Sequence, residues 1–470
     1  MSMRSVLILI LLVGLIVLPA VLAGISNTDH RGTQIPVGRE EVVFWHFWGG
    51  EDGKIVDDVV TRFNESQDKY FVRAIAMPGN NLQAKLFLAV AGGDPPDLVN
   101  QDDPVLAEWA QRNIIEPADT FAPADEVESV RNFLFGSARR LSVYDDRLYG
   151  VCNGLDIRAL YYNATVLKEN GFQPPQTLEE LDRISAAMSP VGAGNREAYT
   201  YLPDSRRLWA WGYVFGGKFY DEQTGLVELN TPELRAALEW MQGYAVRYGA
   251  DNVAAFRQGD QSLPGKAFRL LPSENTTVAG RYTFLMDGQW RCRDILEELA
   301  ERHKARAGDS TVVIPEFGVC PLPYPSESPL ENAGWVNGNF FIVPRGAKNQ
   351  PGAWEFMKFW IGYTDADAAA KTCADGGWIP VSEAVVQSPR FQEFLGTNPL
   401  FEEFVSIAAS ENQFPVPVIP GASLFKRTVE AAAFEAMNSP DTPVEEILDR
   451  AEARIQEHLD RLASDEAPQQ

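Results

Sequence analysis

Cysteine and histidine are scarce in this 470-residue sequence, which contains four of each. The cysteines lack the spacing of metal ligands, and four histidines are too few to complete a zinc site. The GxGxxG fingerprint of dinucleotide-binding folds and the P-loop are also absent, because the Gly-rich turns are isolated pairs. We therefore expect no bound metal ion and no cofactor.

Positive charge is also in short supply. The 41 Lys and Arg residues are outnumbered by 65 Asp and Glu residues, which gives a formal net charge of -24. Nucleic acids and anionic membranes bind basic surfaces, so neither is expected as a partner. The chain nevertheless has 45% hydrophobic residues and 11 Trp, enough for globular packing, and its length predicts two or three domains.

Signatures of hydrolytic enzymes and internal repeats are missing as well. No Gly-x-Ser-x-Gly nucleophile elbow occurs, and neither Cys152 nor Cys320 has a His nearby in the sequence. These two cysteines end the similar segments Tyr-Gly-Val-Cys and Phe-Gly-Val-Cys, so a disulfide between them is one possibility. Buried free thiols are the favoured interpretation of all four cysteines, since Cys is commonly buried; the other two are Cys292 and Cys373.

The N-terminus predicts export. Residues 6–23 form an unbroken apolar stretch that follows a short segment with one positive charge, Arg4. Its length suits either a cleaved signal peptide or a retained membrane anchor. No Cys follows it, which excludes a lipidated Cys at this site. Residues 24–39 are expected to be a linker, and the mature chain to lie in the periplasm or on the outer face of the membrane.

From residue 41 onward, strand and helix patterns alternate. Apolar strand patterns cover 41–48, 70–76 and 97–99, with helical spacing at 55–63, 82–90 and 105–112 between and after them. This alternation predicts parallel βαβ units, whose ligands lie at the carboxyl ends of the strands. Two of those ends are predicted at residues 45–50 and 100–103.

Further along, capped helices follow shorter strand segments. Thr177 with Glu180 forms a capping box before a helix over 178–188, and Thr231 caps a helix that runs to about residue 248. An amphipathic helix is predicted over 444–462. We expect the chain to pass between two lobes three times, near Gly150, Pro321 and Trp378.

Seven segments in this order and spacing resemble the extracellular solute-binding proteins of ABC importers, in the carbohydrate-binding family that includes maltose-binding protein. They are VVFWHFWGG, AVAGGDPPDLV, RLYGVCNGLDIRALYYN with KENGFQPPQTLEEL after it, GGKFYDEQTG, FLMDGQW, NFFIVPRGAKN and GGWIPVS. The resemblance runs from about residue 42 to 462. It implies an α/β fold of the type II periplasmic-binding-protein kind, with two lobes, three interlobe crossings and a ligand cleft between the lobes.

The same resemblance implies lobe boundaries, a partner and the absence of catalysis. The N-lobe would comprise 40–149 and 322–376, and the C-lobe 150–321 and 377–466, with a tail at 467–470. Such proteins bind their solute without chemical change and present it to a membrane permease, so we expect a monomer that is not an enzyme.

Sugars present hydroxyls at their edges and C–H groups on their faces, so a sugar cleft needs aromatic platforms with acidic and amide side chains. Similar proteins carry an acidic residue at the position of Asp156, and Trp290 resembles the family's Gly-x-Trp platform. The full set of candidate ligand-binding residues is His46, Trp48, Asp102, Asp103, Asp156, Arg206, Trp209, Trp290, Trp335, Asn337 and Trp378. Structural roles compete: Asp102 and Asp103 could cap a helix, Asp156 could pair with Arg158, and several Trp could fill the core.

Two alternative functions stay open. An exported glycoside hydrolase would need two carboxylates about 5–10 Å apart, and Asp102, Asp103 and Asp156 are not excluded by spacing. A binding protein for a different solute is the other alternative. Glycerol phosphate would require an Arg or Lys pair, for which Arg158 and Arg206 are available, whereas a polyamine would suit the mixture of acids and aromatics.

Overall fold

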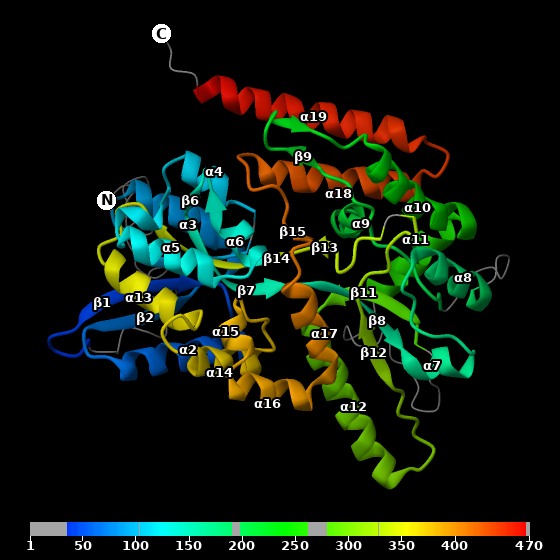
Figure 1. Ribbon diagram of the computed structural model, residues 1–470, viewed down its shortest axis with the longest axis horizontal. Coiled ribbons are helices and arrows are strands. Elements are labelled where there is room, and N and C mark those ends of the chain that lie inside the picture. The colour runs from blue at the N-terminus through cyan, green and yellow to red at the C-terminus, as the bar shows by residue number, and fades with distance from the viewer. Residues whose placement is uncertain (1–34, 103, 190–197, 262–279, 328, 467–470) are drawn as a thin grey trace, which may run out of the picture.

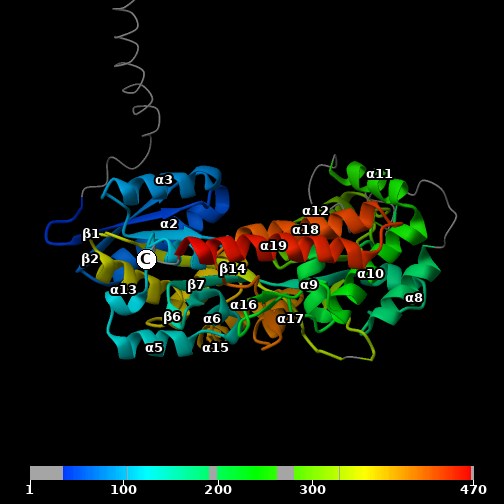
Figure 2. The ribbon, with the colours of Figure 1, turned by 90° about the horizontal axis from the view of Figure 1, so that it is seen from above.

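The computed structural model of the chain describes residues 35–102, 104–189, 198–261, 280–327 and 329–466. The apolar stretch at 6–23, Asp103 and the tail at 467–470 lie outside these residues. Within the described part, no helix is both long and apolar enough to cross a membrane. Two α/β lobes lie side by side in Figures 1 and 2, which bears out the predicted fold class.

The first lobe is built on a six-stranded sheet of order β2-β1-β3-β14-β4, with β7 paired to β14. β1 pairs in parallel with β2 and β3, whereas β14 runs antiparallel to β3, β4 and β7. The strands are β1 (Glu40–His46), β2 (Tyr70–Ala76), β3 (Leu98–Gln101), β4 (Ile115–Glu116), β7 (Gly150–Asp156) and β14 (Asn337–Pro344). The parallel βαβ start predicted from residues 41–99 is confirmed.

Helices cover this sheet because they present apolar stripes to it. In α2 (Gly50–Ser66) the buried residues Val56, Val59, Val60 and Phe63 recur at helical spacing. α13 (Gln350–Trp360) contacts both β1 and β14. The other helices of this lobe are α3 (Gly79–Ala91), α4 (Leu106–Gln111), α5 (Ala124–Phe133), α6 (Gly136–Ser142) and α14 (Ala366–Gly376).

The second lobe has a smaller, wholly antiparallel sheet of order β11-β8-β12. Its strands are β8 (Arg158–Asn163), β11 (Phe284–Gly288) and β12 (Phe317–Cys320). Helices surround it (Figure 1). They are α7 (Ala164–Glu169), α8 (Leu178–Met188), α9 (Leu208–Val214), α10 (Pro232–Tyr248), α11 (Ala250–Gln261), α12 (Trp290–Gly308), α17 (Pro399–Ala408), α18 (Ala422–Asn438) and α19 (Val444–Glu466).

Two of the predicted caps form. Thr177 Oγ1 accepts a hydrogen bond from Glu180 N at 3.3 Å, and the Glu180 carboxylate accepts one from Gln176 N at 2.8 Å. The acid of this capping box therefore reaches one residue further back than the usual partner. Thr231 Oγ1 likewise accepts from Leu234 N, with Pro232 at the first turn of α10.

The chain passes between the lobes along paired strands. β7 stays hydrogen-bonded to β14 as far as Asp156, and β8 begins in the second sheet at Arg158. We take the link between β7 and β8 at Ile157 as the first passage, and the lobe boundary at Gly150 stays a prediction. Ile379 lies on the third passage, and its carbonyl oxygen accepts a hydrogen bond from Leu155 N of β7 at 3.4 Å. Beyond it, α15 (Glu383–Val386) and α16 (Pro389–Thr397) still pack towards α14, and α17 contacts β12.

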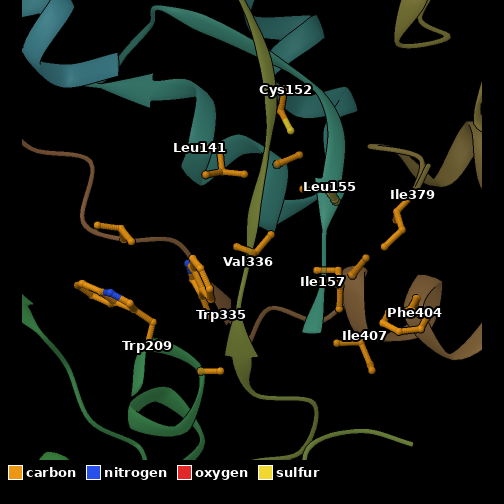
Figure 3. Close-up of a cluster of buried hydrophobic side chains, with 14 of the residues drawn as sticks. Leu141, Cys152, Leu155, Ile157, Trp209, Trp335, Val336, Ile379, Phe404 and Ile407 are labelled. Carbon is orange, nitrogen blue, oxygen red and sulfur yellow. The ribbon is translucent and has the colours of Figure 1, made fainter. Parts of the chain in front are cut away.

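A buried apolar cluster joins the two lobes where the chain passes between them. Figure 3 shows Leu155 and Ile157 of the first passage close to Ile379 of the third. Trp335 of the short β13 (Gly334–Trp335) and Val336, between β13 and β14, extend the cluster towards Trp209. The junction is therefore a packed part of the core.

All four cysteines are free thiols, so the Cys152–Cys320 disulfide is absent. Cys152, Cys292 and Cys373 are buried as expected, whereas Cys320 is partly exposed. Burial raises the pKa of each thiol to about 12.

Candidate functional site

The passage from β7 to β8 gathers polar side chains beside two indoles. Gln289 links this passage to the turn before α12: its Nε2 donates to Asp156 Oδ1 at 3.0 Å and to Leu155 O at 2.9 Å. Its Oε1 accepts from Ile157 N at 3.2 Å. Asp156 is also paired in register with Asn337 of β14. The structure thus brings Asp156, Asn337 and the Trp290 turn together, as a shared site requires.

Trp290 is half-buried and begins α12 directly after the Asp-Gly-Gln turn. The turn needs Gly288, because a Cβ at this residue would lie 2.3 Å from the Trp290 ring. The glycine lets the indole fold back over the end of β11. This packing gives a physical reason for the Gly-x-Trp pattern.

Arg158 lies under this indole and is only 6% exposed. Its Cζ is 4.7 Å from the ring centre of Trp290 and 4.9 Å from that of Trp335. Such short distances are favourable cation–π contacts. Among the described residues, Nε and Nη1 of Arg158 have no hydrogen-bond partner. Burial lowers the pKa of Arg158 to about 10, and the charge of Arg207 acts in the same direction.

Asp287, at the end of β11, is held by arginines. Its carboxylate accepts two hydrogen bonds from Arg291, and it lies 3.8 Å from the Nη2 of Arg207. Burial opposes ionisation, but the charges of these two arginines outweigh it, so the pKa of Asp287 lies below its usual value. Asp287 is therefore an ionised structural acid.

Arg206 sits at the rim of this region and is exposed. Its Nη2 donates to Asp204 Oδ2 at 2.7 Å, within the 3-10 turn η2 (Ser205–Arg207). Burial opposes ionisation of Asp204 too, but the hydrogen bonds and charge of Arg206 hold its pKa well below the usual range. The predicted ligand residue Arg206 thus has an intramolecular partner, and its neighbour Arg207 points its charge towards Asp287.

A second group of candidates lies at the end of β1. Trp48 stacks on Trp378 of the third passage and on Trp360 of α13, with 5.4 and 5.7 Å between ring centres. His46 is 5.9 Å from Trp48 and is almost fully buried. The Nε1 of Trp360 donates to Asn153 O of β7 at 3.3 Å. Trp48 and Trp378 therefore pack with each other, and only Trp378 is partly exposed.

The remaining candidates in the described part of the chain are Trp209, Trp335 and Asp102. Trp209 has no exposed surface and packs against Phe219 at 4.2 Å and Phe425 at 5.6 Å, in the core beneath α18. Trp335 is also buried, but it contacts Arg158. Asp102 follows β3 and is half-buried, and its backbone N–H donates to Gln101 Oε1 at 3.2 Å.

Near the end of β3, a cavity of about 20 Å³ lies between the lobes and has Asn337 in its wall. This volume holds one water molecule. Its other lining residues come from α4 and the segment before it, from α6, from β14 and from the segment before α18: Pro104, Leu106, Ala107, Leu141, Phe340, Pro415, Val416 and Val418. This cavity is too small for a sugar ring. No group of three or more acidic, His or Cys side chains within the described ranges could hold a metal ion.

Sequence reasoning missed Gln289 and Arg207, and it considered Arg158 either as an ion-pair partner of Asp156 or, together with Arg206, as a ligand for a phosphate. Asp156 and Arg158 form no ion pair, and Asp156 accepts a hydrogen bond from Gln289 instead. A signal for Arg158 existed, since a single charge within the apolar run Ile157 to Tyr161 is unusual for a buried strand. Gln289 had no such signal, because an amide in a turn is commonplace.

The family profile of bacterial extracellular solute-binding proteins matches residues 58–399. The maltotriose-binding protein of Pyrococcus abyssi is 21% identical over 427 residues, covering 90% of this chain and 83% of that protein. The sn-glycerol-3-phosphate-binding periplasmic protein UgpB of Yersinia pseudotuberculosis is 22% identical, covering 82% and 83%. The sugar-binding protein MalE of Xanthomonas citri has the same fold, with a TM-score of 0.72, 17% identity and coverage of 92% and 100%.

Proposed function

The chain belongs to the bacterial extracellular solute-binding proteins, which are binding receptors rather than enzymes, and we propose that it captures a sugar or oligosaccharide for an ABC importer. It would do so outside the cytoplasm, as a monomer that delivers its ligand to a membrane permease. The apolar segment at 6–23 would be either removed on export or kept as an anchor.

The observation that carries this proposal is the meeting of Trp290 with Asp156 and Asn337 at the junction of the lobes. A half-buried indole offers a flat apolar face to the C–H groups of a sugar ring. The free carboxylate oxygen of Asp156 and the amide of Asn337 offer an acceptor and a donor for its hydroxyls. The sugar-binding relatives agree with this assignment of ligand class.

Binding would proceed by hinge closure. The strands β7 and β14 are paired along the passage between the lobes, so a change of backbone angles near Ile157 would rotate one lobe against the other. Trp378, on the third passage, would cap the ligand from the first lobe. Asp102, after β3, would supply polar contacts from the same lobe, and Asp103, His46 and Trp48 are further candidates for contact with the ligand.

Hydrolysis of the ligand is not part of the proposal. Of the acids near Trp290, Asp287 is ionised and engaged by Arg291, so it cannot act as a proton donor. Asp156 alone cannot supply the pair of carboxylates that glycoside hydrolysis needs. The receptor nature of the family argues in the same direction.

A second candidate ligand is a polyol phosphate such as glycerol phosphate. The specific observation in its favour is that Arg158 and Arg207 lie within 6 Å of the same Trp335 ring, which supplies the pair of cations such a ligand needs. One relative is named for binding sn-glycerol 3-phosphate.

A thermal-shift screen against a panel of neutral oligosaccharides, glycerol 3-phosphate and a polyamine tests the proposal. A true ligand raises the melting temperature, because binding at a hundredfold excess over Kd adds about 2.7 kcal/mol to the free energy of unfolding. The proposal predicts such a rise for at least one saccharide. A rise for the polyamine alone would overturn the ligand class.

A further inference from the structure

The buried guanidinium of Arg158 has more hydrogen-bond donors than partners. Its Nε and Nη1 have no acceptor among the described residues, although the side chain is 94% buried. Buried polar groups in native proteins nearly always have a partner, and an unpaired buried charge is costly. The two indoles at 4.7 and 4.9 Å compensate its positive charge only through their ring faces.

Arg207 also has an unpaired buried donor, and it lies against the Trp335 ring that Arg158 contacts. Its Cζ lies 5.9 Å from the ring centre of Trp335, and its buried Nε has no acceptor among the described residues. The nearest carboxylate, Asp287, is 3.8 Å from Nη2, which is longer than a hydrogen bond. Two guanidinium groups from different elements, β8 and η2, thus converge on one indole with donors to spare.

The nearby acids are engaged elsewhere. Asp287 accepts two hydrogen bonds from Arg291, and Asp204 accepts from Arg206. Asp156 accepts from Gln289 and forms no ion pair with Arg158. Glu430 of α18 lies close enough for its charge to act on Arg207, but no hydrogen bond or ion pair joins these two described residues. The unpaired donors of Arg158 and Arg207 therefore remain, and they favour an anionic oxygen from outside the chain.

We propose that the ligand carries an anionic group, a carboxylate or a phosphate, which accepts hydrogen bonds from Arg158 and Arg207 while its polyol part packs on Trp290. The inference rests on the proposed function and narrows it to acidic saccharides and polyol phosphates. Because Trp290 covers Arg158, the ligand reaches the guanidinium by displacing this half-buried ring. The emission of Trp290 therefore changes on binding.

The test is isothermal titration calorimetry of the full chain with matched pairs of ligands. Digalacturonate with galactobiose tests a carboxylate, and glycerol 3-phosphate with glycerol tests a phosphate. We expect one anionic member to bind at least about 30-fold more tightly than its neutral counterpart, as charge-assisted hydrogen bonds predict. Equal or tighter binding of both neutral members overturns the proposal but leaves the saccharide function standing. Failure of all four ligands and of the neutral oligosaccharide panel overturns both.

Variants separate ligand recognition from a structural role of the arginine. Arg158→Leu removes the unpaired charge, so the ligand-free protein keeps or raises its melting temperature while affinity for the anionic ligand falls about 30-fold. Arg302→Gln is the matched control, since Arg302 is equally buried but its Nε donates to Glu298 at 3.2 Å. This control should lower the melting temperature and leave affinity unchanged. A large drop in melting temperature for Arg158→Leu without loss of selectivity contradicts the proposal.

Discussion

The indole of Trp48 stacks on that of Trp378, with 5.4 Å between ring centres and 24° between ring planes. Trp48 follows the first strand of the first lobe, and Trp378 belongs to the third passage between the lobes. Trp360 stacks on both rings and donates a hydrogen bond to Asn153 O of β7. The three indoles thus tie the third passage to the first sheet.

The stack predicts a stability cost for Trp378→Ala. Removing the partly exposed indole should lower the free energy of unfolding by about 2 kcal/mol, less than the roughly 3–5 kcal/mol typical of a fully buried Trp. Urea denaturation followed by circular dichroism measures this change. Trp378→Phe keeps a ring in the stack and should lose less. An unchanged urea midpoint for the alanine variant would show that the stack does not hold the passage.

Gly288→Ala should disturb the candidate site without unfolding the protein. The added Cβ would meet the Trp290 ring at 2.3 Å and force the indole away from Arg158. We expect a shifted Trp emission spectrum and weaker saccharide binding, measured by fluorescence titration. Gly243→Ala, in α10, is the control because its Cβ would meet nothing within 4 Å. It should keep full affinity and gain about 0.5–1 kcal/mol of stability.

Asp287→Asn should destabilise the second lobe in a pH-dependent way. It removes one of the two anionic partners of the buried Arg291, which keeps Asp294 at 2.9 Å, so we expect a cost of about 1.5–3 kcal/mol at pH 7. Because the folded-state pKa of Asp287 lies below its unfolded value, its stabilisation is complete above about pH 4 and is lost as the pH falls through the folded-state pKa. Urea denaturation of both proteins at pH 7 and at pH 3 measures this effect. The difference in urea midpoint between Asp287→Asn and the parent protein should be smaller at pH 3.

The control for that prediction is Glu411→Gln. Its exposed ion pair with Arg140 should contribute only about 0–1 kcal/mol. A gap between Asp287→Asn and the parent protein that stays constant down to pH 3 would contradict the assignment of Asp287 as an ionised partner of Arg291.

The thiols should be unreactive in the folded protein. Burial raises the pKa of Cys152, Cys292 and Cys373 to about 12, and Cys320, which is partly exposed, shows the same direction. Thiolate is the reactive form, so a colorimetric disulfide reagent at pH 8 should react slowly with the native chain and with four thiols in urea. Rapid reaction of a native thiol would contradict this packing.

Much of the fold could be predicted because its signals are local. The helical spacing of Val56, Val59, Val60 and Phe63 and the Thr177 cap are properties of short segments, and both form as expected. The end of β7 could not be located, because its pairing with β14 joins residues far apart in the sequence. The boundaries of the lobes stay predictions.

The candidate site was less accessible to sequence reasoning. Asp156 and Trp290 could be selected because the resemblance to solute-binding proteins implies an acid and a Gly-x-Trp platform at these positions. Trp209 and Trp335 could not be distinguished from the sequence, because only tertiary contacts separate them. Trp335 lies against Arg158, whereas Trp209 is buried against Phe219. The role of Gln289 likewise depends on its three hydrogen bonds to the distant β7 passage.

The central claim is that this chain binds a saccharide reversibly and releases it unchanged. Equilibrium dialysis against a panel of neutral and acidic oligosaccharides, with mass spectrometry of the recovered ligand, tests it most directly. The account predicts retention of at least one saccharide with a Kd around 1 μM, equivalent to about −8 kcal/mol, and recovery of that ligand at its original mass. Recovery of shortened saccharides, or retention of none, would contradict it.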